Sequence, residues 1–144
     1  MCRAGDIIII ESHKAYGRSI GKHPFVVLND EGGQITGIDF DFISIIISSF
    51  KDEKQKRRKL SYPGNFPITV EDKVIEDVKT HGEPKDGFVK AEQFFFFQKD
   101  AIEYKKVGYL EEGILDLIIE FIENEMDSTV DYIIDNLVTT DEKE

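Results

Sequence analysis

A short stretch, Gly21-Lys22-His23-Pro24, carries two basic side chains into an apolar run from Phe25 to Leu28. Pro24 fixes its own φ and pushes the preceding residue into an extended conformation, so His23 should sit at a stiff junction between a turn and a strand. An imidazole titrates near neutral pH, which suits it to general acid or base catalysis. The alternative interpretation, a strand entry with two solvated basic residues, is the one that this segment alone favours.

Two further groups of side chains could contact a phosphate. Ser48 and Ser49 follow the buried run Ile45 to Ile47, at a strand end, where side chains leave the core. A basic run then covers residues 51–59 and can attract a polyanion, although a solvated loop explains it equally well. These groups must be positioned by the strands that precede them.

Short apolar runs predict a chain built mainly of β-strands. Ile7 to Ile10 lacks alternation and predicts a strand covered on both faces, whereas Ile35 to Phe42 alternates with period two. Further strands are expected at Phe25–Leu28, Ile45–Ile47, Phe66–Val70, Phe88–Ala91 and Ile102–Val107. We expect residues 11–21 to form a polar loop and residues 71–85 a long loop with room for one helical turn.

Four consecutive phenylalanines, Phe94 to Phe97, do not alternate. A β-bulge or a bend at a barrel corner would let them face more than one layer of the core. An aromatic platform for stacked bases is the functional alternative, and the core interpretation is favoured.

Composition excludes several classes of protein and site. At 144 residues the chain has the length of one domain, and its single Cys2 cannot form an intrachain disulfide. The longest apolar runs are far below the roughly 18 residues of a membrane helix, so no membrane partner is expected. Asp39 and Asp41 share the polar face of a strand, but no third ligand lies nearby, and we expect no metal site.

The net charge of −11 is concentrated at the C-terminus: 12 of the 29 acidic side chains follow residue 110, against one of the 18 basic ones. Apolar residues recur at helical spacing from Leu110 to Met126, which predicts an amphipathic helix over the sheet. A barrel domain is therefore expected over residues 1–125. Residues 126–144 are expected to form an acidic extension, with a short helix up to Leu137 and a polar tail from Thr139.

Four blocks of sequence resemble the MazF/PemK (Kid) toxins of toxin-antitoxin systems over about residues 4–125. They are Gly5–Ile9, Gly21–Leu28, Asp86–Gln93 and Tyr109–Glu112, the last leading into a helix. The resemblance implies a small SH3-like β-barrel with a C-terminal helix, usually a homodimer. The single Cys2 suits a reducing compartment such as the cytoplasm. The resemblance also implies metal- and cofactor-independent endoribonuclease activity on single-stranded RNA rather than DNA, and a cognate antitoxin protein that binds the same groove.

Carried over to this chain, the resemblance places its site on a few positions. The arginine of the family's Gly-x-Arg-Pro motif falls at His23, the Thr or Ser that ends the third strand at Ser48 or Ser49, and the acidic residue of the Asp-Gln pair at Glu92, with Gln93 beside it. An imidazole can transfer protons better than a guanidinium but is a poorer bidentate phosphate clamp.

Metal-free RNA cleavage needs a base for the 2′-OH proton, an acid for the leaving 5′-oxygen, and donors for the charge on the phosphate. The hypothesis is that His23 and Glu92 transfer the protons and Ser48 or Ser49 donates to the phosphate. The expected RNA-binding residues are Arg18, Lys22, Gln93, Lys56, Arg57 and Arg58. The alternative is a catalytically inactive SH3-like barrel that binds RNA or a protein partner.

Overall fold

The computed structural model describes residues 2–10, 13–15, 18–20, 22–35, 37–98, 102–125 and 137–140. Within them the chain is mainly β. The strands of the large sheet are β1 (Asp6–Ile10), β2 (His13–Ala15), β3 (Arg18–Ile20), β4 (His23–Asn29), β7 (Phe42–Ser49), β8 (Asn65–Ile68), β9 (Lys73–Ile75), β10 (Gly87–Lys90), β11 (Phe95–Phe97), β12 (Lys105–Leu110) and β13 (Leu137–Thr140).

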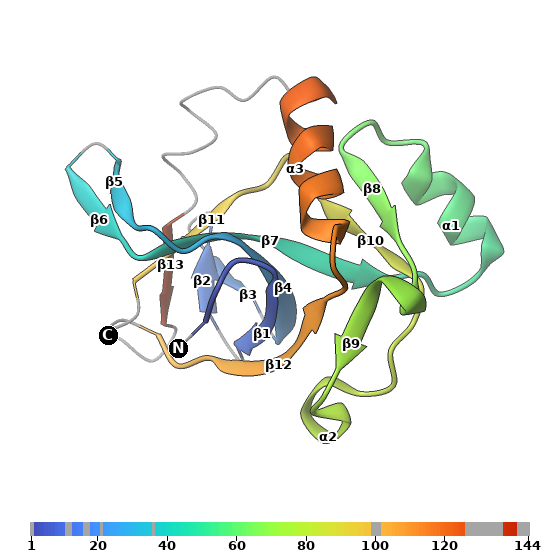
Figure 1. Ribbon diagram of the computed structural model, residues 1–144, viewed down its shortest axis with the longest axis horizontal. Helices are drawn as coiled ribbons and strands as arrows, with labels where there is room; N and C mark the ends of the chain where they lie inside the picture. Colours follow the sequence, from blue (N-terminus) through green and yellow to red (C-terminus); the bar gives the residue numbers. More distant parts are fainter. Residues whose placement is uncertain are drawn as a thin grey trace.

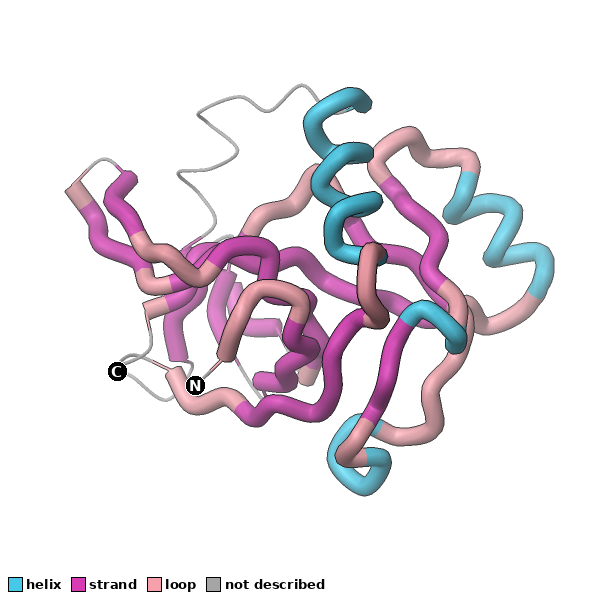
Figure 2. Tube along the Cα trace, in the orientation of Figure 1, coloured by secondary structure: helices cyan, strands magenta, loops and turns pink. Residues whose placement is uncertain are grey.

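The remaining elements are a two-stranded ribbon of β5 (Gly33–Ile35) and β6 (Ile38–Phe40), the helices α1 (Glu53–Leu60), α2 (Val78–His81) and α3 (Ile114–Glu125), and the 3-10 turn η1 (Val70–Asp72). The sheet curls into a largely antiparallel half-barrel, in the order β3-β2-β13-β11-β7-β4-β1-β12-β9, with β10 joining β7 to β8 (Figure 1). Figure 2 shows the helical segments at the periphery, around a body made of strands. None of the described helices is long and apolar enough to cross a bilayer.

β7 is paired along both of its edges. One of its edges pairs with β4, with Phe25 opposite Ile46. The other edge pairs first with β11, where Phe95 lies opposite Ser44, and then with β10, where Phe88 lies opposite Ser48. The chain turns at Ala91 and Glu92, before β11, whereas β11 itself pairs with β7 in regular register.

The sheet is buried on both faces, and each face has its own core. The face that we call the phenylalanine face carries Ile8, Ile10, Phe25, Val27, Phe42, Ile46, Phe95 and Phe97. The face that we call the helix face carries Ile7, Ile9, Val26, Ile45, Ile47 and Val89 and packs against Ile118 of α3. β1 contributes fully buried residues to both faces, which confirms the interpretation of its unbroken isoleucine run.

The phenylalanine block belongs to the core. Phe95, Phe96 and Phe97 are between 0% and 4% exposed. Phe25 meets Phe95 and Phe97 edge to face, with ring centroids 5.3 and 5.2 Å apart. Because these rings are covered by protein, the alternative of an aromatic platform for bases is wrong for this strand.

Two segments expected to be loops contain regular structure. Residues 11–21 include β2 and β3, and residues 71–85 include β9. The short helix α2 is the single helical turn expected within residues 71–85. Strands of three residues are too short to show a readable alternation, and they form because neighbouring strands supply hydrogen-bonding partners. The expected strand from Ile35 to Phe42 is divided among the end of β5, β6 and the start of β7. Between β6 and β7, Asp41 donates its N–H to the Phe97 carbonyl at 2.7 Å.

The basic run is helical rather than a loop. Asp52 caps α1 by accepting the Gln55 N–H at 2.7 Å, and Arg57, Arg58 and Lys59 lie in its last turn, where positive charge complements the helix dipole. The helix has no buried residue. Its sequence therefore lacks the apolar stripe by which a helix is usually predicted, and its basic residues are the feature that stands out.

The C-terminal extension also differs from expectation where it is described. Leu137 begins the strand β13 rather than ending a helical stripe, and Thr139 pairs with Lys14 rather than starting a tail. Residues 126–136 and 141–144 lie outside the described residues. β13 lies on the opposite side of the molecule from α1 (Figure 1).

Candidate functional site

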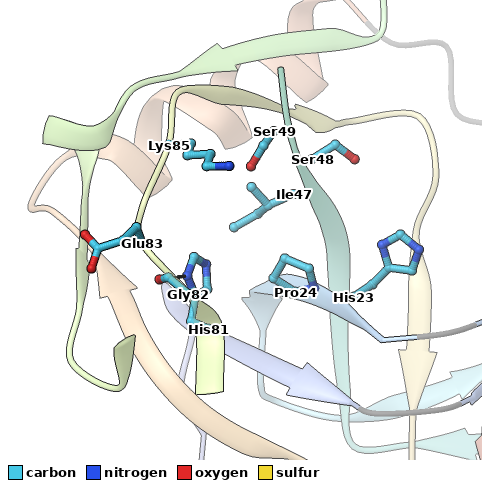
Figure 3. A pocket seen from close by; sticks show the side chains of 9 residues that line it. All are labelled: His23, Pro24, Ile47, Ser48, Ser49, His81, Gly82, Glu83 and Lys85. Carbon is cyan, nitrogen blue, oxygen red and sulfur yellow. Dashed lines mark hydrogen bonds between the residues drawn. The ribbon is translucent and has the colours of Figure 1, made fainter. Parts of the chain in front are cut away.

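His23 and Ser48 lie on the same face of the sheet. Alternation along β4 and β7 places them on the phenylalanine face, beyond Phe25 and Ile46 respectively. Figure 3 shows their side chains on one side of β7, with Ser49 on the other. Of the two serines expected as phosphate donors, Ser48 is therefore the one that shares a face with the imidazole.

Lys90 is the charged neighbour of His23. It follows Phe88 by two residues on β10, and Phe88 pairs with Ser48, so Lys90 belongs to the same face. Burial of the half-buried ring, and secondly the charge of Lys90, lower the pKa of His23 below 6.5. The imidazole is thus mainly neutral at pH 7, the form that can accept a proton.

Positive charge continues from Lys90 to α1. The pKa of Lys90 is lowered by burial and, secondly, by the charge of Lys59 on that helix. Asn65 of β8 donates from Nδ2 to the Lys59 carbonyl at 2.8 Å, which ties the helix to the sheet. We call His23, Lys90 and Lys59 the basic track.

Lys56 of α1 lies next to this track over an aromatic pair. Its Nζ is 6.0 Å from the centre of the Phe50 ring, which stacks on Phe88 at 5.3 Å. Arg57 and Arg58, also expected to bind RNA, are exposed on the same helix. The exposed face of α1 is therefore positively charged, a feature that attracts anions.

Glu92 lies past the C-terminal end of β10, outside the strands that carry His23, Ser48 and Lys90. It is exposed in the turn after β10, and its side chain packs so closely over Gly64 that a Cβ there would overlap it. Gln93 is half-buried beside it and donates its N–H to the Lys90 carbonyl at 3.3 Å. The structure therefore brings together His23, Ser48 and Lys90 and places Glu92 past the end of β10, away from the Ser48–Phe88 pair.

Lys22 contacts another part of the protein. Its Nζ donates to the Thr80 carbonyl in α2 at 2.7 Å. The expected role of Lys22 as a phosphate anchor must therefore compete with this bond. Arg18 lies in β3, and its side chain lies outside the described residues.

A pocket of about 450 Å³ opens beside His23 and Ser48 and extends over the helix face of β7 (Figure 3). On this side it is lined by Pro24, Ile47, Ser49, His81, Glu83 and Lys85. The last three were not among the expected site residues, because residues 71–85 were expected only to form a long loop with one helical turn. The available signal was Asp77, an N-cap residue three positions before Thr80, which predicts the short helix that carries His81.

The described residues contain no group of three or more His, Cys, Asp and Glu side chains that could hold a metal ion. Asp39, considered above as a ligand, accepts a hydrogen bond from Gln34 Nε2 at 2.9 Å. This hydrogen bond joins β5 to β6, in which Gln34 and Asp39 are directly paired.

No family model, curated protein or solved structure matches the chain. Its class is defined by its architecture, a curled and largely antiparallel β-sheet with a C-terminal helix. Its candidate site is defined by a half-buried imidazole beside a serine and a lysine.

Proposed function

We propose that this chain is a metal-independent endoribonuclease of single-stranded RNA, built on a small SH3-like barrel. The observation that supports this most directly is the neutral imidazole of His23 on the same face as Ser48 and Lys90, at one end of the basic track. A base, a hydroxyl donor and a cation are the groups that cleavage by the RNA's own 2′-OH requires.

In this reaction the His23 imidazole takes the proton of the 2′-OH, whose oxygen attacks the adjacent phosphorus. The Ser48 hydroxyl and the Lys90 ammonium donate to the phosphate oxygens as negative charge develops. The bond to the 5′-oxygen then breaks and leaves a 2′,3′-cyclic phosphate. Lys90, whose pKa is lowered, is a stronger acid than an ordinary lysine and supplies the proton for the leaving oxygen.

The proposal includes the role of a toxin in a toxin-antitoxin pair, as a cytoplasmic homodimer inhibited by an antitoxin protein. Three of the four blocks that resemble MazF/PemK toxins coincide with β1, β4 and β10, and the fourth joins β12 to α3. Two of the four blocks therefore fall on the strands that carry His23 and Lys90, whereas β7, which carries Ser48, lies outside all four.

The test is cleavage of a single-stranded RNA in EDTA under single-turnover conditions. Loss of a general base lowers rates by about 10²- to 10⁴-fold, which is the decrease expected for His23→Ala. Lys79→Ala, an exposed lysine of α2 outside the basic track, is the control and should cut normally. Equal cutting by the His23 variant would exclude its role, and cutting of a fully 2′-deoxy substrate would exclude the mechanism.

The second candidate function is binding without cleavage. The position of Glu92 favours it, because the carboxylate expected for proton transfer lies in the turn after β10 and packs over Gly64. An uncut RNA that binds the wild-type protein with strong salt dependence would support this function in place of the first.

A further inference from the structure

We propose that the pocket on the helix face binds one nucleotide, with its phosphate against Ser49, His81 and Lys85 and its base against Pro24 and Ile47. As a subsite for RNA the pocket rests on the proposed function, since it opens beside His23 and Ser48. As a nucleotide site it is argued from its own side chains.

The rim of the pocket carries donors for an anion. Figure 3 shows the ammonium group of Lys85 pointing toward the hydroxyl of Ser49, across the opening, while the carboxylate of Glu83 points away from the cavity. A lysine and a hydroxyl that converge without a facing carboxylate suit a phosphate group.

His81 completes the rim in a fixed orientation. Its Nδ1 lies 2.9 Å from the Gly82 carbonyl oxygen, which can only accept, so Nδ1 carries the hydrogen. This leaves Nε2 as the ring nitrogen that faces a ligand. Gly82 has a φ of 93°, a conformation that favours glycine and turns the chain sharply after the imidazole.

The floor of the pocket is apolar. Ile47 is only 3% exposed, and Pro24 beside it is half-buried. The volume of about 450 Å³ lies in the range of roughly 300–1,000 Å³ that small-molecule sites occupy. A bare phosphate ion would leave most of this space empty, whereas a nucleoside attached to it would cover the apolar floor with its base.

The helix that carries His81 is held from three directions. Asp77 accepts hydrogen bonds from the N–H and the hydroxyl of Thr80, at 3.1 and 2.8 Å. Lys105 of β12 lies 2.9 Å from Asp77, and Lys22 donates to the Thr80 carbonyl at 2.7 Å. Lys22 is therefore a positioning residue, because its bond to Thr80 fixes the rim of the pocket relative to β4.

Binding is tested with uridine 5′-monophosphate, uridine and inorganic phosphate, by calorimetry and by NMR shifts of the pocket residues. The nucleotide should bind at least ten-fold more tightly than either fragment. Lys85→Gln should weaken nucleotide binding by about ten-fold, and Ser49→Ala by several-fold, because each removes a donor to the phosphate. The matched control Lys79→Gln, an exposed lysine of α2 outside the pocket, should bind as the wild type does.

Equal binding by the Lys85 variant and the wild type would overturn the proposal. So would inorganic phosphate that binds as tightly as the nucleotide, because the pocket would then recognise an anion alone. Lys85→Gln and Ser49→Ala change side chains at the pocket rim only. Unfolding curves of both variants, compared with that of the wild type, serve as the control for folding.

A competition experiment separates this inference from the proposed function. An uncleavable 2′-deoxy oligonucleotide displaced by uridine monophosphate identifies the pocket as a subsite for the nucleic acid chain, and absence of displacement identifies a site for free nucleotides. Nucleotide binding without RNA cleavage would support the nucleotide site and contradict the proposed nuclease activity. Cleavage without nucleotide binding would do the reverse.

Discussion

His23 and Lys90 lie on the same face of the sheet, on strands that both pair with β7, and the pKa of His23 is lowered by burial and by the charge of Lys90. Burial of the ring, and secondly the charge of Lys90, favour the neutral imidazole, the form that can act as a base. The same lysine is a donor to any anion that reaches this base. The pair thus combines proton acceptance with charge stabilisation.

Replacing Lys90 by methionine should raise the pKa of His23, because it removes a neighbouring positive charge. Activity should fall at every pH, because Lys90 is also the proposed proton donor. The low-pH limb of the cleavage profile should in addition move to higher pH, so that the fall is larger at pH 6 than at pH 8. NMR titration of the His23 ring protons measures the pKa directly. An unchanged His23 titration in the variant would show that burial alone lowers the pKa.

The same lowered pKa predicts a pH-dependent stability. Because the folded protein binds the His23 proton less readily than the unfolded chain, its contribution to stability is complete above pH 6.5 and is lost as the pH falls below this value. Denaturant unfolding of the wild type and His23→Gln at several pH values measures it. The difference in free energy of unfolding between them should change below pH 6.5 and be constant above pH 8.

Replacing Arg57 and Arg58 by glutamine should weaken RNA binding mainly at low salt. Each lost phosphate contact reduces the slope of log K against log salt concentration by about 0.7 for a single strand, so the double variant should lose about 1.4. Fluorescence anisotropy at several salt concentrations gives this slope. A slope equal to that of the wild type would show that these arginines do not contact RNA phosphates.

Gly87→Ala should be much more destabilising than Gly64→Ala. A Cβ on Gly87 would overlap the backbone carbonyl of Ser48, which cannot move without separating β10 from β7. A Cβ on Gly64 would instead meet the flexible side chain of Glu92, which can turn away. Thermal unfolding of the two variants tests this, and equal melting temperatures would contradict the close pairing of β7 and β10.

Asp77→Ala should lower the melting temperature at pH 7 but have little effect at pH 2. Hydrogen bonds from Lys105 and Thr80 lower the pKa of Asp77 from 3.8 to about 2, so the stabilisation is present above pH 3.8 and is lost as the pH falls toward 2. Thermal unfolding of the wild type and the variant at both pH values measures the difference. A gap in melting temperature that is equal at the two values would contradict the role of the ionised carboxylate.

The sequence predicts those elements whose patterns are local. The isoleucine run of β1, the strand after Pro24 and the spacing of α3 are each readable within a dozen residues, and the structure contains all three. Choosing between Ser48 and Ser49 requires the face of β7 on which His23 lies, and this depends on the register between two strands. The proximity of Lys90 and the position of His81 depend on pairings between distant segments, which no local pattern contains.

The pairing of β1 has a consequence for how the chain folds. Ile8 lies between Phe25 of β4, close by in sequence, and Lys106 of β12, near the other end of the described barrel. The sheet can therefore be completed only after the ends of a very long loop have met, and such loop closure slows folding. We expect refolding in milliseconds to seconds rather than microseconds, with one edge of β1 unpaired until β12 arrives.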